Sequence, residues 1–232
     1  MLSEGAETYR VEETMARVAK ACGVREVESF VTPTGIFLSL EGRTQIRRVF
    51  SRSINLDKVS RGNRLSRQLE TGEIAVAQLP CLLEELARLS FPYRTPWIHV
   101  AAGAASGFFA LVFGGTWSDF LPVFLAGVLV NYSFILLTRR FGLKFIAEFL
   151  SCLLGGLLVV GLYRIGWGGQ LHAMLVGMLM PLFPGVTITN AVRDLMAGDL
   201  VAGVARGAEG ALTAFALAMG VALVLALFCA DC

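Results

Sequence analysis

One apolar stretch of this chain carries features that suit the binding of a small polar solute. Residues 165–192 contain no Asp, Glu, Lys or Arg, and Pro181, Pro184 and Gly185 lie near the middle. As one helix the stretch would be about 42 Å long, whereas the hydrocarbon core of a bilayer is roughly 30 Å thick. Because proline lacks an amide hydrogen and clashes with the preceding turn, we expect the helix to break there. The break would expose backbone dipoles to a solute, as in transporters, unless it is a simple kink in a packed span.

Polar residues beside this break and on other apolar stretches could complete a solute site. Their hydroxyl and amide groups could bind a small polar solute, or they could simply hydrogen-bond a neighbouring helix or the carbonyls that the break frees. The predicted substrate-binding residues are Pro184, Gly185, Val186, Thr187, Thr189, Asn190, Asn131 and Ser106.

Ionisable residues at the ends of the apolar stretches are candidates for proton coupling or gating. Glu148 lies four residues after Lys144, about one turn deeper, where carboxylates are costly and often relay protons. The alternative is an i,i+4 ion pair of the two residues at the interface. The charged residues that follow the broken stretch could be caps, ion pairs or an inner gate. The predicted coupling or gating residues are Glu148, Asp194, Asp199, Arg193, Arg206 and Glu209.

The elements that position these residues are membrane spans. Hydrophobic residues make up 55% of the 232 residues, charged residues make up 16%, and the mean hydropathy is +0.66. A spanning helix needs roughly 20 mainly apolar residues. Five stretches qualify, at about residues 97–114, 119–138, 145–163, 170–192 and 207–229. The sequence therefore predicts a polytopic α-helical membrane protein with five transmembrane helices.

Basic residues in the short loops predict the orientation of the chain. The loops on one side carry five Lys or Arg residues, and the loops on the other side carry only Arg164. Because Lys and Arg are enriched in cytoplasmic loops, we expect a cytoplasmic N-terminus and a C-terminus outside.

Residues 1–96 are predicted to form a small cytoplasmic α+β domain that precedes a membrane domain of residues 97–232. Apolar residues at helical spacing predict a helix that ends before Gly23. The segments VESFV, GIFLSL and TQIRRVFS predict three short antiparallel strands, and residues 56–69 and 74–89 predict two more helices. Pro80 either interrupts the last helix or marks its start. The acidic residues Glu7, Glu12 and Glu13 are interpreted as solvated charges near the positive end of the first helix.

Several classes of function lack their motifs. The sequence contains no G-x-x-x-x-G-K-[ST] or G-x-G-x-x-G segment and no Ser, His and Asp set, so we do not expect an enzyme. A net charge of +2 with mixed signs gives no basic stripe for nucleic acid. The five cysteines have no metal-ligand spacing, so we expect neither a metal site nor a cofactor. The sequence does not decide whether Cys229 and Cys232 form a disulfide.

Four segments of the chain resemble the threonine/serine exporter family, in its N-terminal and longer component. They are SEGAETYRVEETMARVAKACGV, FVTPTGIFLSL, LVFGGTWSDF and MPLFPGVTITNAVRDLMAGDLVAGVARGAEG. The resemblance runs from about Ser3 to about Leu225. It implies a cytoplasmic N-terminal domain, five spans, a place in the bacterial inner membrane, and export of threonine and serine coupled to the proton motive force.

The chain departs from the family's single-chain members, which continue into a second membrane half. It resembles the split form, in which a small separate membrane subunit supplies that half, and alternating access usually needs two halves around a central site. Split members are also linked to dicarboxylates such as succinate, so both substrate classes stay open. A homo-oligomer is possible too, and a membrane-anchored regulatory or scaffold protein is the remaining alternative.

Overall fold

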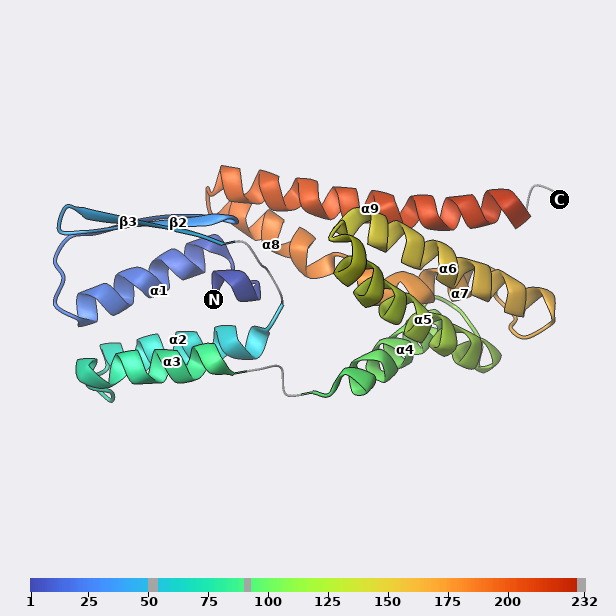
Figure 1. The fold of residues 1–232 in the computed structure, drawn as a ribbon, viewed down its shortest axis with the longest axis horizontal. Coiled ribbons are helices and arrows are strands. Elements are labelled where there is room, and N and C mark those ends of the chain that lie inside the picture. The colour runs from blue at the N-terminus through green and yellow to red at the C-terminus, as the bar shows by residue number, and fades with distance from the viewer. Residues whose placement is uncertain (50–53, 90–92, 229–232) are drawn as a thin grey trace. The chain divides into compact units, whose positions relative to one another are not determined.

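The computed structural model describes residues 1–49, 54–89 and 93–228. Cys229 and Cys232 lie outside these residues. The elements, in order (Figure 1), are η1 (Leu2–Glu4), α1 (Thr8–Ala21), β1 (Val27–Thr32), β2 (Gly35–Leu40), β3 (Arg43–Arg48), α2 (Leu56–Glu70), η2 (Val76–Gln78), α3 (Leu79–Arg88), α4 (Thr95–Val112), α5 (Trp117–Phe141), α6 (Lys144–Arg164), α7 (Leu171–Leu179), η3 (Met180–Leu182), α8 (Gly185–Met196) and α9 (Leu200–Phe228). The elements η1, η2 and η3 are short 3-10 helices.

The residues group into two compact units. The first unit consists of Met1–Pro92 and Val186–Ala208, and the second consists of Tyr93–Gly185 and Glu209–Cys232. The first unit therefore combines the N-terminal elements with nearly all of α8 and the beginning of α9. The predicted domains, residues 1–96 and 97–232, stay a prediction.

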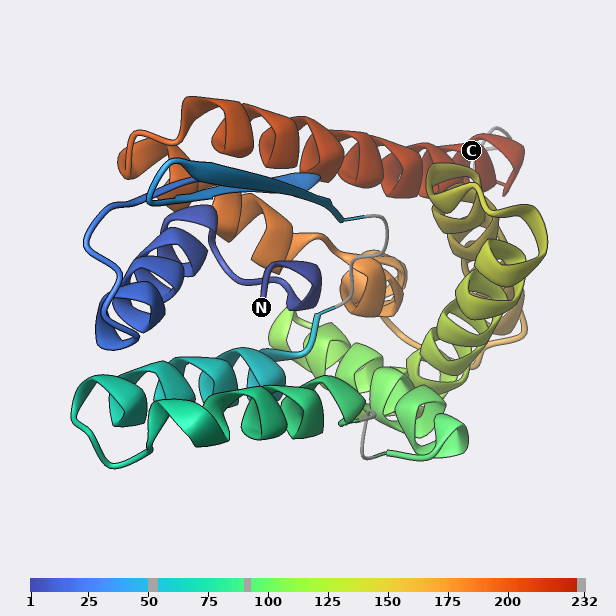
Figure 2. The same ribbon diagram turned by 60° about the vertical axis from the view of Figure 1, so that its left-hand side comes forward.

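Three antiparallel strands lie beside α1 in the first unit (Figure 2). The strand order is β1-β2-β3, and Phe30 on β1 is the cross-strand partner of Phe37 on β2. Val31 is 2% exposed and packs with Leu2 and Val11, whereas Phe30 on the other face is 53% exposed. This alternation is that of a sheet with one buried face. The predicted three-stranded antiparallel sheet is confirmed.

Two helices follow the sheet, and both have recognisable starts. Asn55 caps α2, because its Oδ1 accepts a hydrogen bond from the Lys58 amide at 3.2 Å. Pro80 lies in the first turn of α3, where a missing amide hydrogen leaves no intrahelical hydrogen bond unmade. Pro80 therefore marks the start of this helix and does not interrupt it.

The fourth apolar stretch is broken where the sequence predicts. The helical segment that precedes the break ends at Leu182, Phe183 and Pro184 are not helical, and α8 begins at Gly185. In the described residues, α4, α5, α6 and α9 are long and apolar enough to cross a membrane. The two helical segments around the break make a fifth candidate if they count as one span. The break is confirmed, and the number of candidate spans is four or five.

Small residues bring the helices of the second unit close together. Ser106 on α4 is fully buried, and Gly127 on α5 lies directly against its hydroxyl. A Cβ at Gly177 on α7 would lie 2.8 Å from the Ser106 carbonyl oxygen, which leaves no room for a larger side chain. Close backbone approach at small residues is typical of packed membrane helices. Ser106 therefore lies where α4, α5 and α7 meet.

Asp119 joins two loops of the second unit. Its Oδ2 accepts hydrogen bonds from the amide of Thr116 at 2.7 Å and from the hydroxyl of Thr116 at 2.8 Å. Its Oδ1 accepts from the amides of Gly169 and Gln170, which belong to the loop between α6 and α7. Asp119 is 0% exposed, so these four donors replace the water that an ionised carboxylate would otherwise bind.

Replacing Asp119 with asparagine should destabilise the second unit by about 2 kcal/mol, because an amide group would face N–H donors in place of a carboxylate oxygen. The melting temperature of the purified protein measures the effect. Asp57→Asn is the matched control, since the ion pair of Asp57 with Arg61 is exposed and should contribute less than about 0.5 kcal/mol. Equal melting temperatures for the two variants would contradict this role of Asp119.

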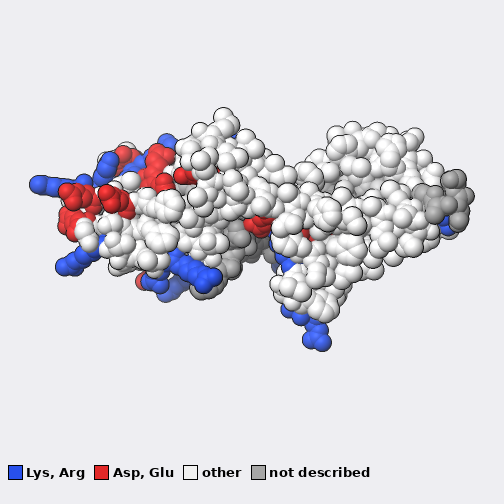
Figure 3. Space-filling view, turned by 90° about the horizontal axis from the view of Figure 1, so that it is seen from above, with Lys and Arg blue, Asp and Glu red and all other residues white. Residues whose placement is uncertain are grey.

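Charged residues are unevenly spread over the surface. Figure 3 shows Lys, Arg, Asp and Glu gathered over one part of the visible face, while much of the remaining face carries none. Large apolar side chains of the second unit are exposed, among them Trp97 at 65%, Val112 at 75% and Trp117 at 75%. Apolar surface of this extent on long helices is typical of contact with lipid. Together with the apolar helices, it indicates a multi-pass membrane protein.

Candidate functional site

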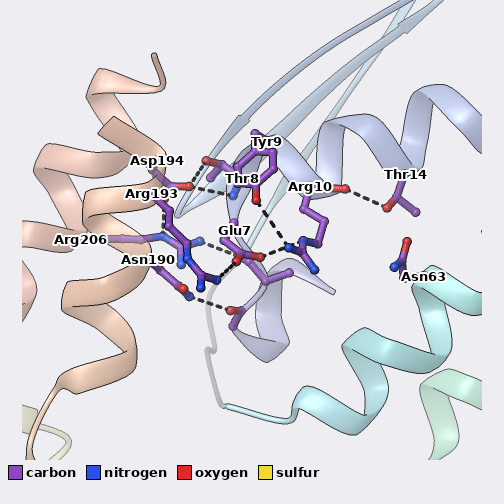
Figure 4. Close-up of polar contacts among 12 residues, drawn as sticks. Glu7, Thr8, Tyr9, Arg10, Thr14, Asn63, Asn190, Arg193, Asp194 and Arg206 are labelled. Carbon is purple, nitrogen blue, oxygen red and sulfur yellow. Dashed lines mark hydrogen bonds and ion pairs between the residues drawn. The ribbon is translucent and has the colours of Figure 1, made fainter. Parts of the chain in front are cut away.

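A polar network in the first unit joins the beginning of α1 to α8 and to the beginning of α9 (Figure 4). We call it the Thr8 network, and its members are Glu7, Thr8, Arg10, Asn190, Arg193, Asp194, Asp199 and Arg206.

The turn between α8 and α9 brings the members of these two helices together. Gly198 has a φ of 91°, a conformation that favours glycine, and it reverses the chain after α8. The Asp199 amide then donates to the Asp194 carbonyl at 2.9 Å. Gly203 on α9 lies so close to α8 that a Cβ there would be 3.0 Å from the Ala191 carbonyl oxygen.

Asp194 caps the N-terminus of α1. Its Oδ1 accepts from the Thr8 amide at 3.2 Å and lies 2.9 Å from the Thr8 hydroxyl, and the two residues are 186 positions apart in the sequence. A carboxylate at this end of a helix is favoured by the helix dipole. Arg206 Nε lies 3.1 Å from Asp194 Oδ2, and Arg206 also donates to the Ala6 carbonyl at 2.8 Å. Asp194 and Arg206 are 0% and 8% exposed, so this ion pair is buried.

Glu7 makes two further ion pairs of the network. Its Oε1 accepts from Arg193 at 2.7 Å, and its Oε2 lies 3.1 Å from Arg10 Nε. Next to it, Asn190 donates to the Gly5 carbonyl at 3.1 Å. The segment that precedes α1 is therefore bound to α8 by the Glu7 side chain and by the side chains of Asn190 and Arg193.

The interpretation of Glu7 as a solvated charge is wrong. Glu7 is 6% exposed, and it is buried because two arginines compensate its charge. Burial by itself raises the pKa of Glu7, but the Arg193 hydrogen bond and the charges of Arg10 and Arg193 outweigh it, so its pKa lies below the ordinary value. Glu12 is partly buried and accepts from the Val31 amide at 2.7 Å, whereas Glu13 is exposed as expected.

The Glu7 ion pairs should make stability depend on pH. Because the pKa of Glu7 is lowered by folding, its contribution is present above the ordinary glutamate pKa of about 4.3 and is lost as the pH falls. Glu7→Gln should therefore lower the melting temperature at pH 7, and the difference from wild type should shrink in acid. Glu13→Gln removes an exposed i,i+4 ion pair with Arg17, which contributes little, so it should change the melting temperature far less. A pH-independent effect of Glu7→Gln would contradict this explanation.

Glu148 is a buried carboxylate in the second unit. It lies on α6, is 2% exposed, and its Oε1 accepts from the Thr213 hydroxyl of α9 at 3.3 Å. Lys144 Nζ lies 3.8 Å from Glu148 Oε1 and only 2.9 Å from Glu209 Oε1. In the described residues, Glu148 Oε2 has no hydrogen-bond partner. The i,i+4 contact that the sequence suggests is present, but Lys144 is shared and is closer to Glu209.

The other predicted residues occupy varied positions. Asn131 Oδ1 lies 2.8 Å from His99 Nδ1, and Pro184 is buried. Val186 is 41% exposed. The eight predicted substrate-binding residues are divided between the two units. The first unit contains Val186, Thr187, Thr189 and Asn190, and the second contains Ser106, Asn131, Pro184 and Gly185. Their role in substrate binding stays a prediction.

In the described parts of the chain, no group of three or more His, Cys, Asp or Glu could hold a metal ion.

Curated proteins from several bacteria are similar to nearly the whole of this chain. A curated protein of Klebsiella aerogenes named "Probable succinate transporter subunit YjjP" is 26% identical over 98% of this chain and 90% of its own length. Its namesake in Escherichia coli K12 is 24% identical with the same coverage. A "Probable threonine/serine exporter" of Mycobacterium tuberculosis is 25% identical over 97% of this chain but only 44% of its own length. No solved structure shows significant similarity to the chain.

A family model decides the assignment, because it covers nearly the whole chain. The model is described as "Putative threonine/serine exporter", and it matches residues 1–228, which include both units and the Thr8 network. The chain therefore belongs to the threonine/serine exporter family.

Proposed function

We propose that the chain is one subunit of a secondary transporter that exports threonine and serine and is driven by the proton motive force. The observation that carries the proposal is the break at Phe183 and Pro184 inside a stretch without charged residues. The Gly185 amide donates to the Phe183 carbonyl at 2.9 Å, so a carboxylate group of the solute would bind to the next amides of α8, those of Val186 and Thr187. Polar contacts to the solute would come from Thr187, Thr189 and Asn190, which follow the break in the first unit.

The orientation that follows has a cytoplasmic N-terminus and a C-terminus outside. It rests on the excess of Lys and Arg in the loops on one side of the spans. With five spans, the α+β domain and the Thr8 network would both lie on the cytoplasmic side. The network would then act as an inner gate, because it ties α8, which follows the break, to the N-terminal segment.

Glu148 is proposed as the residue that couples transport to protons. An ionised carboxylate is costly at a buried position in a membrane span, and one of its oxygens has no hydrogen-bond partner in the described residues. Uptake of a proton removes that cost and leaves Lys144 to pair with Glu209 alone. Two states with different ion pairing are the minimum that a coupling site needs.

A dicarboxylate is the second candidate substrate. The observation that favours it is the length of the relatives: the two proteins named succinate transporter subunits align over 90% of their length, and the mycobacterial exporter aligns over 44%. A carboxylate at the start of α8 would suit either substrate.

A second membrane subunit is proposed to complete the transporter. The relatives named subunits match this chain in length, and the mycobacterial protein is more than twice as long as the matched part. Alternating access around a central site usually needs two membrane halves.

Counterflow in proteoliposomes tests the proposed function. The chain is purified with its companion membrane subunit, the vesicles are loaded with unlabelled threonine or succinate, and entry of the labelled solute is followed. We expect threonine counterflow that requires both subunits. Counterflow of succinate alone would replace the substrate and keep the transporter, whereas no flux of either solute would favour the anchored scaffold protein.

A further inference from the structure

β3 is the outer edge of the three-stranded sheet. It is last in the strand order, and all six of its residues are exposed. The Val49 amide, directly after β3, donates to the Thr34 carbonyl at 2.9 Å. Because the residues of an antiparallel pair are hydrogen-bonded alternately, the main-chain groups of Thr44 and Ile46 point away from β2. No hydrogen bond satisfies these groups within the described part of the chain, so another strand can pair with them.

An apolar row crosses the exposed face of the sheet and ends at this edge. Phe37 is the cross-strand partner of both Phe30 and Ile46, so the three side chains lie next to one another. The two phenyl rings are 6.0 Å apart, and Ile46 is 65% exposed. Directly opposite side chains stabilise paired strands. A further strand beside β3 would therefore continue the row with an apolar residue opposite Ile46.

The charges of β3 select the strand that can pair with it. Three of its six residues are arginines, Arg43, Arg47 and Arg48, and none is acidic. The cross-strand partners of Arg43 and Arg47 on β2 are Leu40 and Ile36, so β2 places no carboxylate opposite them. Opposite charges on adjacent strands are favourable. A strand that pairs with β3 should therefore be acidic at the positions opposite these arginines.

Two other occupants fit this edge less well. A second copy of the chain would bring the three arginines of its own β3 next to these, with no acidic residue on either strand. An anionic lipid surface could contact the apolar row, but Glu28 is exposed on the same face, two residues before Phe30. Lipid also supplies no ladder of main-chain hydrogen bonds to β3.

A hollow of about 560 Å³ lies at the hairpin between β2 and β3. It is lined by Leu38, Leu40, Glu41, Arg43 and Gln45. The four strand residues among them share one face of the sheet, because Leu38 pairs with Gln45 and Leu40 pairs with Arg43. Alternate side chains of a strand beside β3 would point to this face, and the hollow can receive them.

We infer that β3 is a docking site for an extended acidic segment of a partner protein. Main-chain hydrogen bonds form with the outward groups of Thr44 and Ile46, and an apolar side chain of the segment lies opposite Ile46. Acidic side chains lie opposite Arg43 and Arg47, on the face that holds the hollow. Because both arginines are an odd number of positions from Ile46, acidic and apolar residues alternate in the segment. The inference goes beyond the proposed function and requires no transport.

Binding of a synthetic peptide to the purified full-length protein tests the site. The probe is a short, fluorescently labelled peptide that alternates glutamate and valine, and its fluorescence anisotropy measures binding. We expect binding that weakens as salt is added, because exposed ion pairs are screened. The same peptide with every backbone amide methylated keeps its charge but cannot donate main-chain hydrogen bonds, so it should not bind.

Substitutions on β3 separate the main-chain contacts from the charge contacts. Thr44→Pro removes an amide hydrogen that points away from β2, so it keeps the ladder between β2 and β3 but should weaken peptide binding about tenfold. The double variant Arg43→Gln with Arg47→Gln should weaken binding about fivefold. Arg64→Gln, at an exposed position of α2, is the matched control and should leave binding unchanged. If Thr44→Pro does not fold, the double variant and the methylated peptide decide.

Several results would overturn the site. They are no binding of the alternating peptide, equal binding of the methylated peptide, and wild-type binding by a folded Thr44→Pro or by the double arginine variant. A dimer that Thr44→Pro converts to a monomer would overturn it in favour of a second copy. Peptide binding that disappears when the protein is moved from neutral to anionic nanodiscs would overturn it in favour of a lipid surface.

Discussion

Replacing Arg206 with methionine is expected to destabilise the protein by about 3–5 kcal/mol and to abolish export. Arg206 is 8% exposed and faces the fully buried Asp194, so the substitution leaves a carboxylate inside the first unit without its cation. It also leaves the Ala6 carbonyl without its donor. Denaturant unfolding and counterflow by the reconstituted complex measure the two effects.

The double variant Asp194→Asn with Arg206→Met separates stability from function. Removing both charges of a buried pair is often nearly neutral, so most of the lost stability should return, while export should stay lost if the pair acts in gating. Arg61→Met is the matched control, because its ion pair with Asp57 is exposed and should contribute less than about 0.5 kcal/mol. Recovery of export in the double variant would contradict the gating role.

Replacing Glu148 with glutamine is expected to uncouple solute movement from protons. The amide keeps the shape of the side chain and can still contact the Thr213 hydroxyl, but it cannot bind and release a proton. Accumulation driven by a proton gradient should fall about tenfold or more, while counterflow, which needs no net proton movement, should persist. Both rates are measured in the same vesicles, at several pH values.

A matched substitution at an exposed site controls for the loss of a carboxylate. Glu84 on α3 makes an exposed ion pair with Arg88, so Glu84→Gln should leave both rates unchanged. If Glu148→Gln accumulates solute with the wild-type rate and pH dependence, Glu148 is not the coupling residue.

Features that depend on nearby residues could be predicted from the sequence. Proline has no amide hydrogen and cannot continue a helix, so Pro184 predicted the break that precedes α8. β-Branched and aromatic residues next to a proline-containing turn predicted the strand that contains Val31, because such residues favour extended backbone. Runs of about 20 mainly apolar residues predicted the candidate spans, because a helix of that length crosses the hydrocarbon core of a bilayer.

Features that depend on distant residues could not be predicted in full. Thr8 and Asp194 are 186 positions apart, and a glutamate before an amphipathic helix has the same local sequence whether it is solvated or paired. The nearby Arg193 was a usable signal, because an arginine that follows a long apolar stretch needs a partner. Asp119 had a local signal too, because Thr116 precedes it by three residues, the spacing of a helix cap.

Accessibility of the break to water and substrate tests the central claim most directly. Val186→Cys and Thr187→Cys are made singly in a chain whose five native cysteines are replaced with serine. Val159→Cys, at a fully buried position of α6, is the control. We predict that a membrane-impermeant thiol reagent labels at least one of the first two residues, that the transported solute slows this labelling, and that Val159→Cys stays unlabelled. Labelling that is absent at both residues, or that neither threonine nor succinate changes, would contradict a substrate path at the break.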